Sequence, residues 1–119
     1  MAEAFDDRSR TISVSHEVRE MMRQLVNKGL FNEQRDVWTL GCALGIATGE
    51  EIPFSDGVTF SRLDGLDENS EFQVIMLNEY PDLSPADRRK KMLNHVEWGV
   101  REIYRKEQIS SLDFSTIGK

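Results

Sequence analysis

Few residues of this chain have a type and spacing that support catalysis or metal binding. A zinc site needs histidine or cysteine ligands a few residues apart, whereas Cys42, His16 and His95 are isolated in the 119-residue sequence. Cys42 lies in the most apolar segment, where a thiol is more often a small packed side chain than a reactive thiolate. We therefore expect no metal site, no cofactor and no catalytic nucleophile.

A group of carboxylates in the middle of the chain is the next candidate site. Asp64, Asp67 and Glu68 could hold a hard cation, but the alternating oxygen ligands of a calcium-binding loop are missing. The sequence also contains no GxSxG turn, no phosphate-binding glycine loop and no GxGxxG. We interpret the acids as solvated loop residues and place an enzyme behind the binding functions.

An aromatic residue among cations is the main binding signal. Four such residues fall on one side of a predicted C-terminal helix: Lys91, Trp98, Arg101 and Arg105. His95 is predicted on the same side. This surface is typical of a groove for phosphates or a nucleic-acid strand, and Trp and Arg are also favoured anchors of protein interfaces. Alternatively, Trp98 packs under a loop while the cations stay hydrated or pair with the chain's own acids.

The net charge of −6 conceals a strong asymmetry along the chain. Residues 50–87 contain ten acidic side chains and only Arg62 as a base, whereas residues 88–106 contain seven basic and two acidic side chains. These two segments either attract each other within the fold or form two separate binding surfaces.

The segments that position these residues begin with a short strand and a helix. Residues 10–15 alternate polar and apolar side chains, which is the period of a half-buried strand. Ser15 is a natural N-cap, and the apolar residues after it recur on one helical face as far as Lys28 and Gly29. This pattern predicts a helix over residues 16–28.

The next helix is apolar on almost every side. Asn32 can cap it, and residues 33–47 contain hardly any polar side chain. Such a helix is stable only when other elements or a second subunit cover it, so we expect residues 37–46 to be shielded from water on every side. A neighbouring backbone could approach closely at three small residues: Gly41, Ala43 and Gly45.

The second half of the chain is less regular. Turn signals interrupt residues 49–70, so this segment is either a functional flap or contains short elements that the pattern does not place. Apolar residues predict a helix over 71–79, and Ser84 with Pro85 begins another that spans 85–106.

The predicted fold class is mainly α. We expect a single compact domain of about four helices with a short N-terminal β-strand and the apolar helix 33–47 at its centre. Residues 1–9 and 108–119 are expected to be flexible tails.

The N-terminal order of strand, helix and helix resembles a ribbon-helix-helix regulator, in which strands from two subunits pair and lie in the major groove. That resemblance implies a homodimer and places Arg10, Thr11 and Ser13 against bases or phosphates. Two features depart from the pattern: residues 1–49 are not basic, and residues 33–47 offer few polar side chains for the exterior of such a protein.

A second set of residues extends over most of 16–106. It comprises a Gly-x-Phe after the first helix, an Arg-Asp that opens the apolar helix, an Ala-Leu-Gly with a later glycine, and a glycine in the last helix: Gly29, Phe31, Arg35, Asp36, Ala43, Leu44, Gly45, Gly49 and Gly99. In these residues the chain resembles small accessory proteins encoded beside bacterial DNA phosphorothioation and related phage-defence genes. Because the residues serve packing and capping, the resemblance implies a fold and a genomic setting rather than a catalytic site.

These patterns together predict a non-enzymatic accessory or regulatory protein of a prokaryotic DNA-directed system, concerned with defence or DNA modification, that binds DNA or a protein partner. The first alternative is a protein adaptor without nucleic-acid contact, and the second is a ribbon-helix-helix-like transcriptional regulator. No apolar run is long enough to span a membrane, the N-terminus lacks a secretory signal, and Cys42 cannot form an internal disulfide. A cytoplasmic location is therefore expected.

Overall fold

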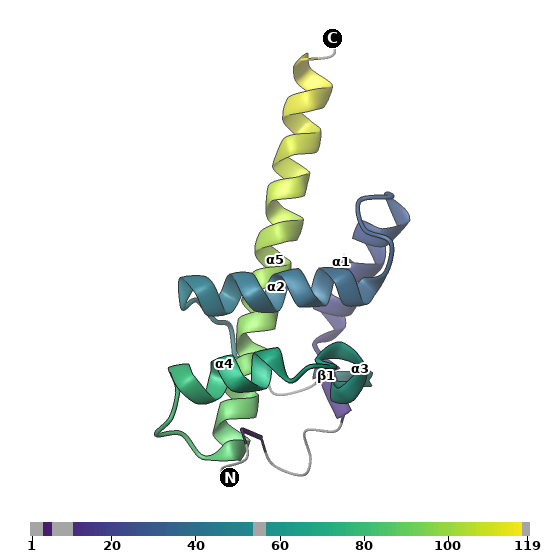
Figure 1. Ribbon diagram of the computed structural model, residues 1–119. Helices are drawn as coiled ribbons and strands as arrows, with labels where there is room; N and C mark the ends of the chain where they lie inside the picture. Colours follow the sequence, from purple (N-terminus) through teal and green to yellow (C-terminus); the bar gives the residue numbers. More distant parts are fainter. Residues whose placement is uncertain (1–3, 6–10, 54–56, 118–119) are drawn as a thin grey trace.

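The computed structural model describes residues 4–5, 11–53 and 57–117, and it describes side-chain surroundings as far as residue 108. A long C-terminal helix forms the axis of the molecule, and the other elements gather around its N-terminal half (Figure 1). The elements are, in chain order, β1 (Thr11–Val14), α1 (His16–Asn27), α2 (Gln34–Thr48), β2 (Val58–Arg62), α3 (Leu63–Leu66), α4 (Glu71–Glu79) and α5 (Pro85–Ile117). The predicted mainly helical class with a short N-terminal strand is confirmed.

β1 and β2 form an antiparallel sheet, which the sequence predicts only in part. The alternation along β1 is confirmed, because Ile12 and Val14 are buried in the core. β2 and α3 both fall in the segment that the pattern leaves unassigned, so this segment contains short elements, while its residues 54–56 lie outside the described part. No side chain of β2 itself is fully buried, which explains its weak hydrophobic alternation.

α2 lies across α5 with the two backbones in direct contact (Figure 1). A Cβ atom added to Gly99 would overlap the carbonyl oxygen of Gly41, and one added to Gly45 would overlap the carbonyl oxygen of His95. Larger side chains at these positions would hold the helix axes further apart. The predicted close approach is therefore confirmed for Gly41 and Gly45, whereas Ala43 is exposed on another side of α2.

The hydrophobic core lies where the sheet, α1, α2, α4 and α5 meet. Trp38 of α2 is fully buried, and its ring makes a T-shaped contact with Phe72 of α4 at a centroid distance of 5.9 Å. The surrounding elements contribute other fully buried side chains: Ile12, Val18, Met22, Leu25, Met76, Met92 and Val96. Met92 and Val96 therefore lie on the side of α5 that packs into this core.

The prediction that the central helix is shielded from water on every side is wrong. Trp38 and Cys42 are buried, but Leu40 is 48% exposed and Ala43 is also exposed. The crossing places α5 against the glycine side of α2, and in the described part of the chain no element covers the side that carries Leu40 and Ala43.

Two helix boundaries also differ from the predictions. The N-cap of α2 is Glu33 rather than Asn32, because the Asp36 carboxylate accepts a hydrogen bond from the Glu33 backbone N–H at 3.1 Å. The last helix continues past the predicted end near Lys106, so residues 108–117 belong to α5. The apolar period fades there, but no glycine or proline interrupts the helix before Gly118.

Because α2 and α5 cross in direct backbone contact, one methyl group added at the crossing should strongly lower the stability of the fold. Replacing Gly99 with alanine should lower the free energy of unfolding by about 3 kcal/mol, the upper part of the usual range for overpacking, because the new Cβ meets backbone that cannot rotate away. Gly65→Ala is the control, since a Cβ there meets no atom within 4 Å. Urea denaturation measures both, and equal stability of the two variants would contradict the crossing.

Candidate functional site

The residues predicted to bind nucleic acid or a partner divide into two groups in the structure. Thr11 is exposed and Ser13 half-buried on β1, while Arg10 lies outside the described residues. The other group is on α5, as predicted: Lys91, Trp98, Arg101 and Arg105. Ser13 lines a hollow of about 360 Å³ beside the start of α5, but no member of the second group lines it.

The cations of the second group each have a carboxylate partner within the chain: Lys91, Arg101 and Arg105. Lys91 forms an ion pair with Glu51 and lies 5.1 Å from the centroid of the Tyr80 ring. Arg101 approaches Glu97 at 3.4 Å, and the Nε of Arg105 donates to Glu102 at 3.1 Å. The Lys91–Glu51 pair is one case of the predicted attraction between the basic helix and the acidic middle, whereas the shortest arginine contacts are with carboxylates of α5 itself. Arg101 also lies 3.8 Å from the Glu17 carboxylate of α1.

Glu97 is a buried carboxylate that the sequence analysis does not identify. Its side chain is fully buried, and it accepts a hydrogen bond at 3.0 Å from the backbone N–H of Ser15, the N-cap of α1. Arg101 donates to both Glu97 and the Ser15 hydroxyl at 3.4 Å. Arg101 therefore neutralises a buried charge where α1 joins α5, which is a structural role.

His95 is buried, although its sequence position predicts a place on the exposed basic side. Its Nδ1 is 2.7 Å from the carbonyl oxygen of Glu50, and its Nε2 is 2.9 Å from the Tyr80 hydroxyl. A carbonyl can only accept, so Nδ1 carries the proton, and in the neutral ring Nε2 accepts from Tyr80. His95 thus links the end of α2 to the end of α4.

Two further buried polar groups also hold the fold together. Arg88 is 3% exposed and donates to the backbone carbonyls of Tyr80, Leu83 and Ala4. For Cys42, burial and then the nearby Asp67 carboxylate raise the pKa of the thiol well above its ordinary value. The thiol therefore stays protonated near neutral pH, which suits a packed side chain.

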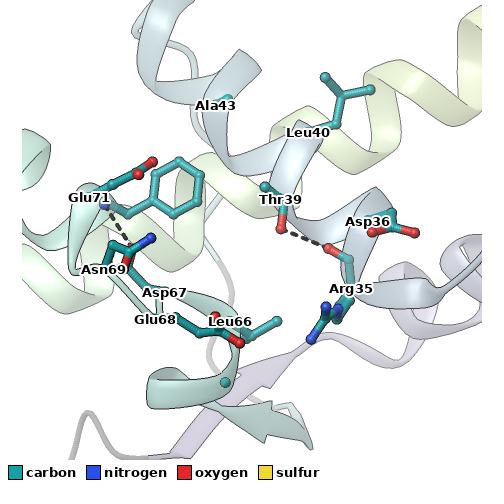
Figure 2. A pocket seen from close by; sticks show the side chains of 12 residues that line it. Arg35, Asp36, Thr39, Leu40, Ala43, Leu66, Asp67, Glu68, Asn69 and Glu71 are labelled. Carbon is teal, nitrogen blue, oxygen red and sulfur yellow. Dashed lines mark hydrogen bonds between the residues drawn. The ribbon is translucent and has the colours of Figure 1, made fainter.

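An open groove with apolar side chains lies between α2 and the segment from α3 to the start of α4, and we call it the α2–α4 groove. Its volume is about 490 Å³. Figure 2 shows α2 along one wall and residues 66–71 along the other. The apolar lining comes from four residues on three helices: Leu40, Ala43, Leu66 and Phe72.

The polar lining of the α2–α4 groove is mainly acidic. Asp67 is 5% exposed and accepts hydrogen bonds from the backbone N–H groups of Phe72 and Gln73, so it caps α4. The interpretation of Asp67 as a solvated loop acid is therefore wrong. Ser70, the residue before α4, has a φ of 57° and makes no side-chain cap, which leaves that role to Asp67.

Two other carboxylates of the groove are open to a binding partner. Glu68 and Glu71 are exposed, and among the described residues neither has an ion-pair or hydrogen-bond partner for its side chain. Among the described lining residues Arg35 is the only cation, and its Nε is 3.0 Å from the exposed carboxylate of Glu33. The groove therefore combines apolar side chains with an excess of negative charge.

The motifs and periodicity of the sequence do not predict this groove. The apolar helix is one indication in the sequence. A short chain has few elements to cover such a helix, and the sequence does not show which element covers each of its sides. The acidic segment 50–87 was the second signal, since it supplies Glu68 and Glu71. Neither feature shows that the apolar helix and the acidic segment lie together, because their arrangement depends on contacts between distant segments.

Comparison with known proteins gives no match to a family model, to a curated protein or to a solved structure. Among the residues that the structure describes, no three His, Cys, Asp or Glu side chains converge as a metal site would require. Over the same residues, every helix is too short or too polar to cross a lipid bilayer.

The structural role of Arg101 can be separated from a binding role. Arg101→Ala should lower the free energy of unfolding by about 1–3 kcal/mol, because Glu97 would stay buried without its cation. Arg105→Ala should leave stability unchanged, since its pair with Glu102 is on the surface. Thermal and urea denaturation test this, and a surface that serves only to bind DNA would leave both variants equally stable.

The ion pair of Glu51 and Lys91 predicts a pH dependence. Burial alone would raise the pKa of Glu51, but the hydrogen bond and charge of Lys91 hold it below its ordinary value of 4.5. The pair therefore stabilises the fold above that value, and its contribution is lost as pH falls through the lowered native pKa.

In the Glu51→Gln variant the free energy of unfolding should consequently fall less steeply between about pH 5 and pH 3. The difference from the unmodified protein in this fall should be less than about 1 kcal/mol. Urea titrations across this range measure the effect. Glu68→Gln, at an exposed acid without a partner in the described chain, should leave the slope as in the unmodified protein. A slope that changes equally in both variants would contradict the assignment.

Proposed function

We propose that the protein is a non-catalytic accessory or regulatory protein that acts by binding another protein through the α2–α4 groove. The observation that carries this proposal is the exposure of Leu40 and Ala43 in the apolar helix α2. Contiguous apolar surface with a polar rim is a common feature of protein-binding sites. The groove supplies such a surface, with carboxylates at its edges.

Binding of a protein is better supported than direct contact with DNA. A DNA surface gains affinity from cations that neutralise phosphates, but Lys91, Arg101 and Arg105 already neutralise carboxylates of the chain. The groove itself is acidic and would repel a phosphate backbone. The place of the protein in a bacterial DNA-modification or defence system is proposed from the sequence resemblance, with the DNA contact made by other components of that system.

The ribbon-helix-helix hypothesis has less support than the adaptor hypothesis. That class uses its N-terminal strand to pair with the strand of a second subunit. Here β1 pairs with β2 of the same chain, and its residues Ile12 and Val14 face the core. A monomer that binds a different protein accounts for this sheet without a second copy.

Site-specific photo-crosslinking tests the proposed function. Leu40 and Leu30 are 48% and 45% exposed, so they form a matched pair at which a photoreactive benzoylphenylalanine can replace leucine. After irradiation of cells that naturally contain the protein, position 40 should form a discrete adduct with a different polypeptide, and position 30 should not. Equal labelling at both positions, or no adduct at position 40, would contradict the groove as the binding site.

A further inference from the structure

The shape of the α2–α4 groove fits a helix better than an extended strand. α2 and α4 lie on the same side of α5, one beside the other (Figure 1). The ring of Trp38 on α2 contacts the ring of Phe72 on α4. No strand edge is among the described residues that line the groove, so these residues offer no row of backbone groups for a β-partner. Two helical walls with apolar side chains are the arrangement that accepts the apolar face of a third helix.

The apolar surface continues beyond the groove along both helices. On α2, Ala47 is one turn beyond Ala43 and is also exposed, so small side chains let a partner backbone approach. On α4, Ile75 is one turn beyond Glu71 and is 39% exposed. A helix that extends beyond the groove would therefore meet one further exposed apolar side chain on each of the two helices.

The charge at the rim selects the class of partner. Glu68 and Glu71 are exposed without ion-pair partners in the described chain, and Asp36 adds a third carboxylate on the α2 wall. Removing these carboxylates from water without a counter-charge would be unfavourable, whereas lysine or arginine side chains at the edges of a helix would pair with them.

From these contacts we propose that the groove binds a cationic amphipathic helix of another protein, an inference that rests on the groove being the binding site. The apolar face of that helix would contact Ala43, Leu66 and Phe72, and its basic edges would lie along Glu68 and Glu71. A second copy of this chain fits less well, because each copy has a net charge of −6 and the cations Lys91, Arg101 and Arg105 are already paired. Nucleic acid has the wrong charge.

Binding of synthetic peptides by fluorescence anisotropy tests the partner class. A labelled lysine–leucine amphipathic helix should bind the full chain, and affinity should fall as salt is added because the rim pairs are screened. The same peptide with glutamate in place of lysine should not bind. Shifts of backbone NMR signals on binding should concentrate at Ala43, Leu66 and Phe72.

Variants of the protein distinguish the groove from non-specific attraction to an acidic chain. Glu68→Lys with Glu71→Lys should weaken binding of the lysine peptide by about tenfold or more at low salt. Glu50→Lys with Asp82→Lys makes the same change of net charge at exposed acids outside the groove and should have a clearly smaller effect. Ala43→Trp should block binding without changing the charge.

The outcomes separate this inference from the proposed function. An adduct at position 40 together with no binding of the lysine peptide would overturn the cationic helix but leave the groove as a protein-binding site. Equal losses in the two charge variants, or NMR shifts on α5, would place the peptide outside the groove and overturn the inference. An adduct at position 40 with a second copy of the chain would overturn it in favour of self-association.

Discussion

The backbone contact between α2 and α5 is the constraint on which the rest of the structure depends. Gly41 and Gly45 on one helix and Gly99 on the other bring the two helices closer than any other residue types would allow. This contact uses one side of the apolar helix α2, so the remaining elements have to cover its other sides. They cover it only in part, and the uncovered strip with Leu40 and Ala43 becomes a wall of the groove.

Two polar residues of α5 are removed from water on different sides of the helix. His95 lies directly against Gly45 of α2, and Glu97 is buried where α1 joins α5. Each is stabilised by partners from distant parts of the chain: the Glu50 carbonyl and Tyr80 hydroxyl for His95, and the Ser15 N–H for Glu97. Polar residues on α5 therefore fix the positions of α1, α2 and α4 relative to one another.

The local parts of this fold could be predicted from the sequence. Caps such as Ser15, glycine stops such as Gly29 and the apolar periods place β1, α1, α2, α4 and the start of α5, because these features act within a few residues. The pairing of β2 with β1 could not be predicted in this way, since it joins segments far apart. The α2–α4 groove cannot be predicted in this way either, because it is also formed by segments that are apart in the sequence. Periodicity likewise identifies Lys91 and Arg101 as cations on one side of a helix but does not identify the carboxylates that neutralise them.

The T-shaped contact between Trp38 and Phe72 has a consequence for how the groove can be observed. Trp38 is completely enclosed and Phe72 lines the groove, whereas the other tryptophan, Trp98, is half-buried on α5. The emission of Trp38 is thus sensitive to any change in the separation of α2 and α4, while a soluble quencher acts first on Trp98. With Trp98 replaced by phenylalanine, the chain would carry its own optical reporter of whether the groove opens when it is occupied.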